Sequence, residues 1–295
     1  MSYSSDLLSK SCIERFYLPI KNKDNLKLFV KRDDLIHSEI SGNKLRKLKL
    51  NILKAADHDC KRFVTYGGAF SNHLLAVAAI GKMEGVKSTG IVRGDELNPN
   101  SNEVLKRCAE LGMQFQFTTR EYYKREKYNN GVASFEGEKA LFIPEGGANR
   151  EGVLGCCDII DETSNDYDYI FVGQGTSTTS LGIYQAMSIK SKLVVVPVLK
   201  GYDSIREMSQ ISSKFGLDFD ASRVVVLDDF HFGGYAKSNK ELNDFITDFN
   251  ALGQFKVEPV YTGKVLFGLN EFIKTVKGIK KVLFVHTGGL HYMLG

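Results

Sequence analysis

Continuous apolar runs of strand length recur along this chain, and they constrain its fold more than any other feature. Clear examples are Leu193–Val198, Ser222–Leu227 and Lys281–Val285. These runs do not alternate apolar with polar residues, as a strand with one solvated face would, and a parallel sheet buries such strands on both faces. Segments with helix-like apolar spacing lie between them. The sequence therefore predicts an α/β fold with parallel sheets.

The same alternation is expected through the first part of the chain. Strands are predicted at Leu26–Arg32, Arg62–Tyr66, Ser88–Val92, Gln114–Phe117, Ala140–Ile143 and Tyr169–Val172. Helices are predicted from Lys44 to about Asp57, and at Leu74–Met83, Ser101–Leu111, Thr119–Tyr128 and Ile183–Ile189. Several of the strands run into glycine-rich loops, and in such folds ligands bind where the strands end.

The length of 295 residues exceeds what one hydrophobic core usually supports, so two subdomains are expected. We expect residues 1–48 and 161–295 to form a large domain and residues 49–160 a small inserted domain. A ligand is expected in the cleft between them, because such junctions are common binding sites.

Charge and composition exclude several classes of function. The net charge of +4 is small and the basic residues are scattered, so nothing favours a nucleic-acid partner. No apolar stretch approaches the roughly 20 residues of a membrane span. The six histidines have no metal-ligand spacing, so no metal is expected. The five cysteines are odd in number without a CxxC pair, and no leader precedes them, which indicates a reducing, cytoplasmic setting.

The segment Ser41–Lys47 opens a predicted helix and places Lys44 in its first turn. Unbonded N–H groups there give a positive local field, which disfavours an ammonium group. Burial would lower the pKa of Lys44 further, and a neutral amine can form a Schiff base. The alternative is that Lys44, together with neighbouring basic residues such as Lys47, forms only a solvated helix face.

Two loops are candidates for binding a ligand. Gly67–His73 places Ser71 and Asn72 at the start of a helix, where they either cap the helix or contact a substrate. Gly173–Gly182 is rich in Gly, Ser and Thr and precedes a helix, which favours a phosphate group. It matches neither a Walker loop nor GxGxxG, so a nucleotide is poorly supported. The alternative for this loop is a threonine-rich turn.

Five motifs in order carry a resemblance: Ser41–Lys47, Gly67–His73, the phosphate loop, Pro259–Lys264 and His286–Gly289. Together they resemble the 1-aminocyclopropane-1-carboxylate (ACC) deaminase / D-cysteine desulfhydrase family. These enzymes use pyridoxal 5′-phosphate and have the tryptophan-synthase-β-like fold, called fold type II. The resemblance runs from about Lys31 to Leu290 and implies two α/β subdomains with the cofactor in the cleft between them.

The resemblance also implies roles for individual residues. Lys44 would bind the cofactor covalently and then act as the base, with Ser71, Tyr235 and Tyr261 as the other catalytic residues. The implied cofactor-binding residues are Lys44, Asn72, Gly175, Thr176, Ser177, Thr178, Thr179 and Thr262. The implied substrate-binding residues are Ser71, Asn72 and His73. The family further implies a small amino acid as substrate and a homodimer.

Three positions bear on the substrate. Family members that open the cyclopropane ring typically have Glu, Gln and Leu where this chain has Thr262, His73 and Thr287. A hydroxyl group need not keep the pyridine nitrogen protonated, and expelling a thiol needs a weaker electron sink than opening a ring. We therefore expect D-cysteine desulfhydrase-like α,β-elimination to a 2-oxo acid and ammonia.

Other interpretations stay open at this point. The alternatives are an ACC deaminase, a catalytically silent pyridoxal-phosphate-binding protein, and an unrelated phosphate-binding transferase. His73 has a structural alternative, a helix-start histidine bonded to the backbone. His286 is expected to be a buried strand-end histidine with its hydrogen bonds satisfied, rather than a catalyst.

Overall fold

The computed structural model describes residues 6–18, 26–40, 42–160, 166–278 and 280–290. Ser41, which begins the lysine motif, lies outside the described residues. The α-helices are α2 (Asn43–Asp57), α3 (Asn72–Glu84), α4 (Glu103–Glu110), α5 (Arg120–Glu126), α6 (Arg150–Gly155), α7 (Thr178–Ala186), α8 (Ser204–Phe215), α9 (Lys240–Ala251) and α10 (Thr262–Phe272). Short 3₁₀ helices are η1 (Asp33–Leu35), η2 (Glu145–Gly147), η3 (Cys156–Ile159), η5 (Ala221–Arg223) and η6 (Asp228–His231).

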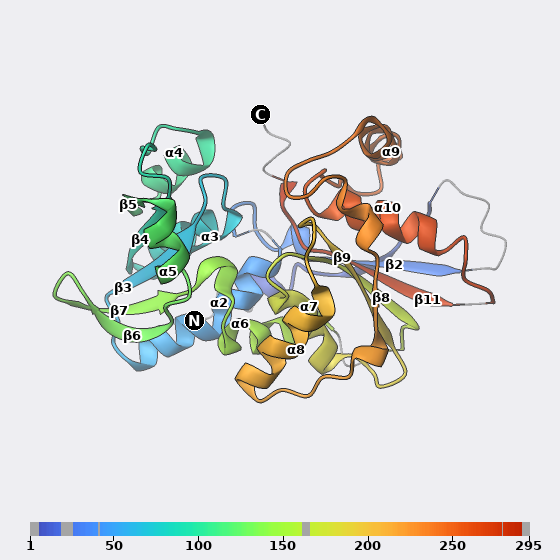
Figure 1. The fold of residues 1–295 in the computed structure, drawn as a ribbon, viewed down its shortest axis with the longest axis horizontal. Helices are drawn as coiled ribbons and strands as arrows, with labels where there is room; N and C mark the ends of the chain where they lie inside the picture. The colour runs from blue at the N-terminus through green and yellow to red at the C-terminus, as the bar shows by residue number, and fades with distance from the viewer. Residues whose placement is uncertain (1–5, 19–25, 41, 161–165, 279, 291–295) are drawn as a thin grey trace. The chain divides into compact units, whose positions relative to one another are not determined.

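The strands are β1 (Ile13–Arg15), β2 (Lys27–Arg32), β3 (Arg62–Gly67), β4 (Lys87–Arg93), β5 (Gln114–Thr118), β6 (Gly131–Phe135), β7 (Glu138–Ile143), β8 (Tyr169–Gln174), β9 (Lys192–Pro197), β10 (Val224–Val226) and β11 (Lys281–His286). Figure 1 shows how they follow one another along the chain. The chain has two compact units: unit 1 comprises residues 1–36 and 157–295, and unit 2 comprises residues 37–156.

These boundaries differ from the expected ones at residues 48 and 161. The helix α2, which carries Lys44, belongs to unit 2 rather than to the larger unit. The physical reason is its packing on α6, where a Cβ at Gly155 would lie 2.1 Å from the carbonyl oxygen of Arg46. A buried amide pair, Asn51 and Asn149, joins the same two segments. That the cofactor lies between two subdomains stays a prediction.

Unit 1 is built on a six-stranded sheet in the order β1-β2-β11-β8-β9-β10. Its strands from β2 to β10 are parallel, and only β1 at the edge is antiparallel. Helices α7 and α10 pack on β8 and β9, and α9 packs on α10. In a parallel sheet the loops after β2, β8 and β11 emerge at one edge. This edge therefore gathers the segments after Arg32, Gln174 and His286.

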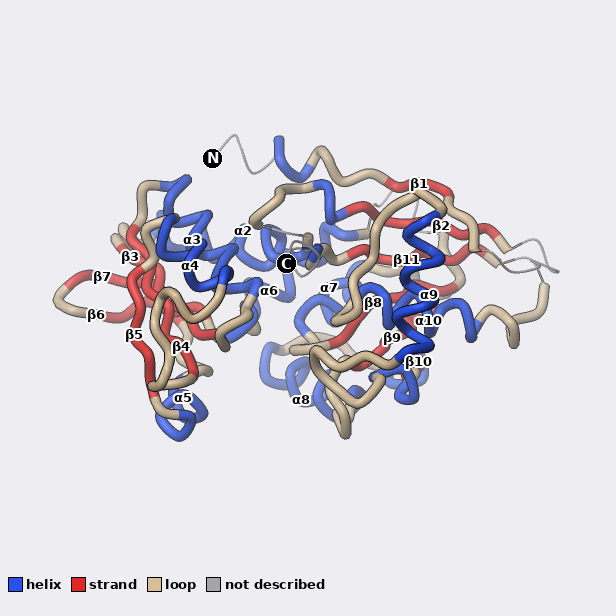
Figure 2. The backbone as a smooth tube through the Cα atoms, turned by 90° about the horizontal axis from the view of Figure 1, so that it is seen from above, coloured by secondary structure: helices blue, strands red, loops and turns tan. Residues whose placement is uncertain are grey.

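Unit 2 is built on a five-stranded sheet in the order β5-β4-β3-β7-β6. Strands β5, β4, β3 and β7 are parallel, and β6 forms an antiparallel hairpin with β7. Figure 2 shows the strands of each sheet as neighbouring red segments. The loops after β3 and β7 leave from the same edge of this sheet, next to the start of α3.

Each unit has its own apolar core. In unit 1 the buried strands contribute Val30, Phe171, Val194 and Phe284, as their continuous apolar runs predict. In unit 2 Val64, Tyr66 and Ile91 form the corresponding cluster. The predicted α/β fold with parallel sheets is confirmed, with one antiparallel edge strand added to each sheet.

The largest error in a predicted helix boundary is at α7, which begins at Thr178 rather than at Ile183 and ends at Ala186 rather than at Ile189. The Thr and Ser residues predicted as loop therefore form the first turn of the helix. None of the helices in the described residues has the length and apolarity needed to cross a bilayer.

Candidate active site

Lys44 lies in the first turn of α2, as the sequence predicts. The helix starts after its N-cap residue Gly42, whose φ of 58° favours glycine. Because glycine has no side chain, the N-cap residue makes no capping bond to the first turn. The first turn holds no acidic residue. Below it, Leu45, Leu48 and Ile52 are buried at helical spacing. These buried residues anchor the helix. Its first turn is basic and has no capping side chain from the N-cap residue.

The amine of Lys44 is perturbed in the direction that Schiff-base chemistry needs. Its Nζ donates to Oδ1 of Asn43 at 2.8 Å. Burial, followed by the charge of Lys47, lowers the pKa of Lys44 to about 7. The Nζ of Lys47 donates to the carbonyl oxygen of Gly146 at 3.2 Å, and burial lowers its pKa too. A solvated basic face is thus excluded for Lys47, which is 4% exposed.

Ser71 and Asn72 begin the buried helix α3. Ser71 is its N-cap, and its Oγ accepts from the backbone N–H of Leu74 at 3.4 Å. Gly67 makes this turn possible, because a Cβ there would lie 2.8 Å from Oγ of Ser71 and 2.6 Å from Leu74. Oδ1 of Asn72 is buried with no hydrogen-bond partner in the described residues. The capping interpretation of Ser71 is confirmed, and Asn72 retains unused bonding capacity.

The hydrogen bonds of His73 determine its tautomer. Its Nε2 lies 2.9 Å from Oγ1 of Thr65, and that hydroxyl donates its only proton to the carbonyl of Ile143. Nε2 of His73 must therefore carry the proton, and Nδ1 is left as an acceptor. Nδ1 is buried and has no partner among the described residues. Burial and the charges of Lys44 and Lys47 lower the pKa of His73 well below its ordinary value, so the ring is neutral.

Unit 1 contributes the loop predicted to bind phosphate. Ser177 occupies the N-cap of α7 with a φ of 57°, and its side chain makes no capping bond. Its Oγ instead accepts from Nε2 of Gln174 and lies 2.9 Å from the hydroxyl of Tyr202. The first turn of α7 begins at Thr178, and helix starts in general offer backbone N–H groups that an anion can bind. That this start binds phosphate stays a prediction, and the hydroxyl of Ser177 is engaged within the protein.

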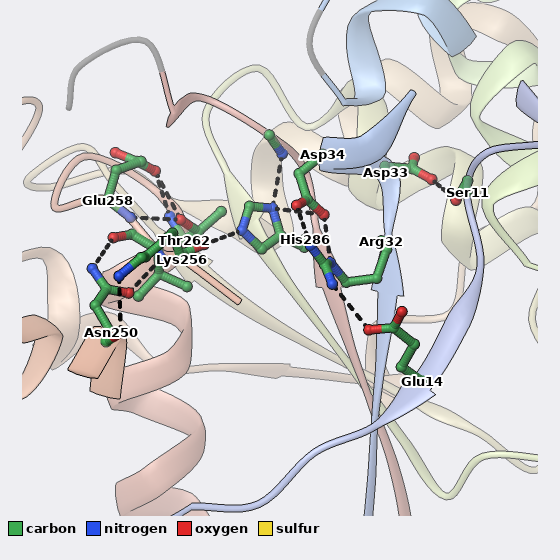
Figure 3. Close-up of polar contacts among 12 residues, drawn as sticks. Ser11, Glu14, Arg32, Asp33, Asp34, Asn250, Lys256, Glu258, Thr262 and His286 are labelled. Carbon is green, nitrogen blue, oxygen red and sulfur yellow. Dashed lines mark hydrogen bonds and ion pairs between the residues drawn. The ribbon is translucent and has the colours of Figure 1, made fainter. Parts of the chain in front are cut away.

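A buried carboxylate, Glu258, holds the start of α10, and Figure 3 shows it beside Thr262. Oε2 of Glu258 accepts from the backbone N–H of Val260 at 2.6 Å, and Oε1 accepts from the N–H of Tyr261 at 2.9 Å and of Thr262 at 2.8 Å. The hydroxyl of Thr262 donates to Oε1 and accepts from the N–H of Glu258. Glu258 thus caps α10, and burial raises its pKa.

The two predicted tyrosines lie together in unit 1. The rings of Tyr235 and Tyr261 meet edge to face with centroids 5.9 Å apart. A Cβ at Gly175 would lie 3.7 Å from Cε1 of Tyr261 and 3.9 Å from its hydroxyl. Tyr261 therefore packs beside the loop that precedes α7, and Tyr235 packs against Tyr261.

His286 is satisfied within the protein, as expected. Its Nε2 lies 2.6 Å from the carbonyl oxygen of Lys256, and its Nδ1 accepts from the N–H of Gly288 (Figure 3). Asp34 lies 3.6 Å from Nδ1 and is itself bound by two nitrogens of Arg32. This cluster fixes the ends of β2 and β11.

Unit 2 thus brings together Lys44, Asn72 and His73, and unit 1 brings together Gly175, Tyr235, Tyr261 and Thr262. Sequence reasoning missed two buried residues, Glu258 and Lys264. An acidic residue followed by Pro259 at a helix start is a capping signal that could have identified Glu258. No comparable signal marks Lys264, whose acceptors are carbonyl groups about thirty residues away.

Residues 16–288 match the sequence profile of a family described as pyridoxal-phosphate dependent enzyme. The chain belongs to this family. It is therefore an enzyme of a pyridoxal-phosphate dependent class, and the predicted cofactor is confirmed.

Individual relatives agree with this family. A Thermotoga maritima protein provisionally named an ACC deaminase is 28% identical, over 97% of this chain and 96% of its own length. An Arabidopsis thaliana protein is named a mitochondrial bifunctional D-cysteine desulfhydrase/ACC deaminase. It is 28% identical, over 94% of this chain and 76% of its own length.

Solved structures share the fold. The crystal structure of an ACC deaminase homologue has a TM-score of 0.78 and 24% identity, and covers 98% of this chain and 95% of its own. A fungal L-serine ammonia-lyase from Rhizomucor miehei has a TM-score of 0.65 and 14% identity. The match covers 95% of this chain and 93% of the ammonia-lyase chain. These likenesses place the chain in the fold of type II pyridoxal-phosphate enzymes.

The residues of this pyridoxal-phosphate dependent enzyme fit its cofactor. Lys44 offers an amine with a pKa of about 7 to an aldehyde. Asn72 and His73 each have a buried polar atom without a partner among the described residues, which suits a ligand with polar ring substituents. The uncapped start of α7 suits a phosphate group.

Proposed function

We propose that this enzyme is a deaminating lyase that removes a β-leaving group from a small amino acid, with D-cysteine as substrate. The overall reaction converts D-cysteine and water into pyruvate, ammonia and hydrogen sulfide. The observation that carries the proposal is the amine of Lys44, with its pKa of about 7. It lies on the same unit as acceptor atoms of Asn72 and His73 that have no partner among the described residues.

The residues of unit 2 act on the amino acid. When bound, pyridoxal phosphate supplies an electron sink for the electron pair left at the substrate Cα. Lys44 first holds the cofactor and then takes the proton from Cα, because its neutral amine is a base at physiological pH. The hydroxyl of Ser71 and the amide Nδ2 of Asn72 donate to the substrate carboxylate. His73 stays neutral and accepts a hydrogen bond from the substrate through Nδ1.

The residues of unit 1 act on the cofactor and the leaving group. The backbone N–H groups of Thr178 and Thr179, with Gly175, Thr176 and Ser177 forming the turn, bind the phosphate. Tyr261 and Tyr235 give or take a proton at the leaving group through their hydroxyls.

Thr262 supports elimination over ring opening. We assign it to the pyridine nitrogen. Its neutral hydroxyl group carries no negative charge that would keep this nitrogen protonated, as a carboxylate would, so the electron sink is weaker. Thiolate is a good leaving group and needs less of this sink than opening a cyclopropane ring does.

The test uses the purified holoenzyme with D-cysteine, L-cysteine and ACC in parallel, with sulfide and 2-oxo acid measured from each. D-Cysteine should give sulfide and pyruvate in equal amounts, and Lys44→Ala should lower turnover by about 10³-fold. The matched control is Lys49→Ala, on the same helix. Faster turnover of ACC than of D-cysteine would make the enzyme an ACC deaminase, the activity in its relatives' names. Full turnover by Lys44→Ala would contradict the role of Lys44, and no turnover of any amino acid would indicate a silent binding protein.

We also propose that the enzyme is a homodimer and acts in the reducing cytoplasm. Its family resemblance supports the dimer, and its odd number of cysteines without a CxxC pair supports the compartment. Light scattering coupled to size exclusion tests the dimer, since a monomer mass of 32.9 kDa would contradict it.

A further inference from the structure

The segment that carries Tyr235 has an unfavourable backbone. It follows η6, and Phe232, Gly233, Gly234 and Ala236 all have positive φ values, of 50°, 93°, 115° and 55°. Two of these four residues are not glycine, and side chains with a Cβ rarely adopt this region. Such a turn persists only where the surrounding structure holds it.

Within the turn, the N–H of Gly233 donates to Nδ1 of His231. The side chain that holds the turn from outside is Lys264 on α10. Its Nζ donates to the carbonyl oxygen of His231 at 2.8 Å and of Gly234 at 2.7 Å. These two carbonyls stand on either side of the left-handed residues Phe232 and Gly233. Lys264 therefore bridges the two ends of the turn.

The chemistry of Lys264 shows that it serves more than packing. The residue is 0% exposed, and among the described residues its Nζ donates to two backbone carbonyls rather than to a carboxylate. A buried ammonium group is costly, and an apolar side chain would fill the space without that cost. Burial lowers the pKa of Lys264 to about 8, with the charge of Glu258 opposing this shift. What the ammonium group adds is two directed bonds to one turn.

The start of α10 fixes the positions of both tyrosines, Tyr235 and Tyr261. Tyr261 is the N-cap of α10, and Lys264 follows it by three residues, on the same face of the first turn. Glu258 fixes the backbone of Tyr261, and Lys264 fixes the turn that leads to Tyr235. The edge-to-face contact between the two rings is the result.

We propose that Lys264 is the positioning residue for Tyr235: it bonds the carbonyls of His231 and Gly234 and so holds the Tyr235 ring against Tyr261. This deepens the proposed function, and its catalytic consequence rests on the role assigned to Tyr235 there. The structural part stands on its own, so the two can fail separately.

The structural part is tested by fluorescence, because the chain contains no tryptophan. Tyr235→Trp places a single indole in the turn, where the native ring is 41% exposed. Adding Lys264→Met to the holoenzyme should raise acrylamide quenching of this indole about twofold and shift its emission to the red, because the turn opens. The matched control is Lys256→Met, which removes another lysine-to-carbonyl bond, from Nζ of Lys256 to Asn250, away from this turn.

Quenching in Lys264→Met equal to that of the Lys256→Met control would overturn the proposal. If Lys264→Met does not fold, Lys264→Gln replaces it. Its amide can bond one of the two carbonyls, so an intermediate rise in quenching is expected, and no rise would again overturn the proposal.

The catalytic consequence is tested by a double-mutant cycle with D-cysteine. Lys264→Met should lower kcat about tenfold with little change in KM, and it should have no further effect when Tyr235 is already Phe. An equal loss in both backgrounds would mean that Lys264 acts elsewhere, and would overturn its assignment to Tyr235. Full activity of Tyr235→Phe, with increased quenching in Lys264→Met, would refute the catalytic role of Tyr235 and leave the positioning role intact.

Discussion

Replacing the buried carboxylate Glu258 by glutamine tests how the segment around Tyr261 is held. Glutamine has nearly the same shape but only one acceptor atom. If its oxygen replaces Oε1, the bonds from Tyr261 and Thr262 survive, and the new amide group faces the N–H of Val260. The amide group of the new glutamine and the backbone N–H of Val260 are both donors. They would then face each other where the carboxylate of Glu258 now accepts a 2.6 Å hydrogen bond from Val260.

The magnitude follows from these contacts. A buried N–H left without an acceptor costs about 1–3 kcal/mol. Losing a negative charge at a helix start costs about 0.3–1 kcal/mol, partly offset because burying that charge is itself unfavourable. We expect Glu258→Gln to destabilise unit 1 by about 2–3 kcal/mol. For a unit of this size that lowers Tm by about 4–12 °C.

The assay is thermal unfolding by calorimetry, with kcat measured well below the transition. The control is Glu271→Gln on the same helix, where the carboxylate pairs with Lys274 near the surface and should contribute at most about 1 kcal/mol. A Glu258→Gln protein as stable as this control would refute the capping role. A stability loss with unchanged kcat would show that the cap does not position Tyr261 for catalysis.

Three further predictions concern unit 2. The rate at which the apoenzyme attaches pyridoxal phosphate should rise with pH through about 7 and then level off, because Lys44 loses its proton near pH 7. A rate that still rises tenfold per pH unit above pH 8 would contradict this. Lys47→Met removes the neighbouring charge, so it should raise the pKa of Lys44 and move that profile to higher pH; an unmoved profile would mean that burial alone sets the pKa. Gly155→Ala places a Cβ 2.1 Å from the carbonyl of Arg46 and should cost about 1–3 kcal/mol in denaturant unfolding, whereas stability equal to wild type would show that α2 can shift freely.

The order of strands and helices could be predicted because it depends on local patterns. The apolar residues of the runs Leu193–Val198 and Lys281–Val285 are buried, and these runs form inner strands of a parallel sheet, as predicted. The run Ser222–Leu227 was predicted to be buried in the same way, but it contributes only the edge strand β10, which is partly buried because β9 covers one side of it alone. The start of α7 was predicted too late because Thr178 and Thr179 have low helix propensity, and only the tertiary structure shows that their first turn is helical.

A site residue could be predicted from the sequence only where its residue type and its position in a helix were enough to indicate its chemistry. Lys44 was recognisable from its place at a helix start, but the neutral state of His73 depends on Thr65 and Ile143, which meet only in the folded unit. Lys264 was beyond prediction for the same reason, since carbonyl acceptors have no sequence signature. The assignment of Lys44 to the inserted unit also depends on a close contact, between Gly155 and Arg46.

The helix starts of the described residues differ in whether a side chain caps the first turn. Six helices begin with a side chain that accepts from a first-turn N–H, and their N-caps are Ser71, Asn102, Thr119, Asn149, Asp203 and Asn239. In α10 the carboxylate of Glu258 does the same. The N-caps of α2 and α7 make no such bond. A capping carboxylate at α2 would raise the pKa of Lys44, and one at α7 would repel a phosphate, so both kinds of chemistry require that neither start carries a carboxylate cap.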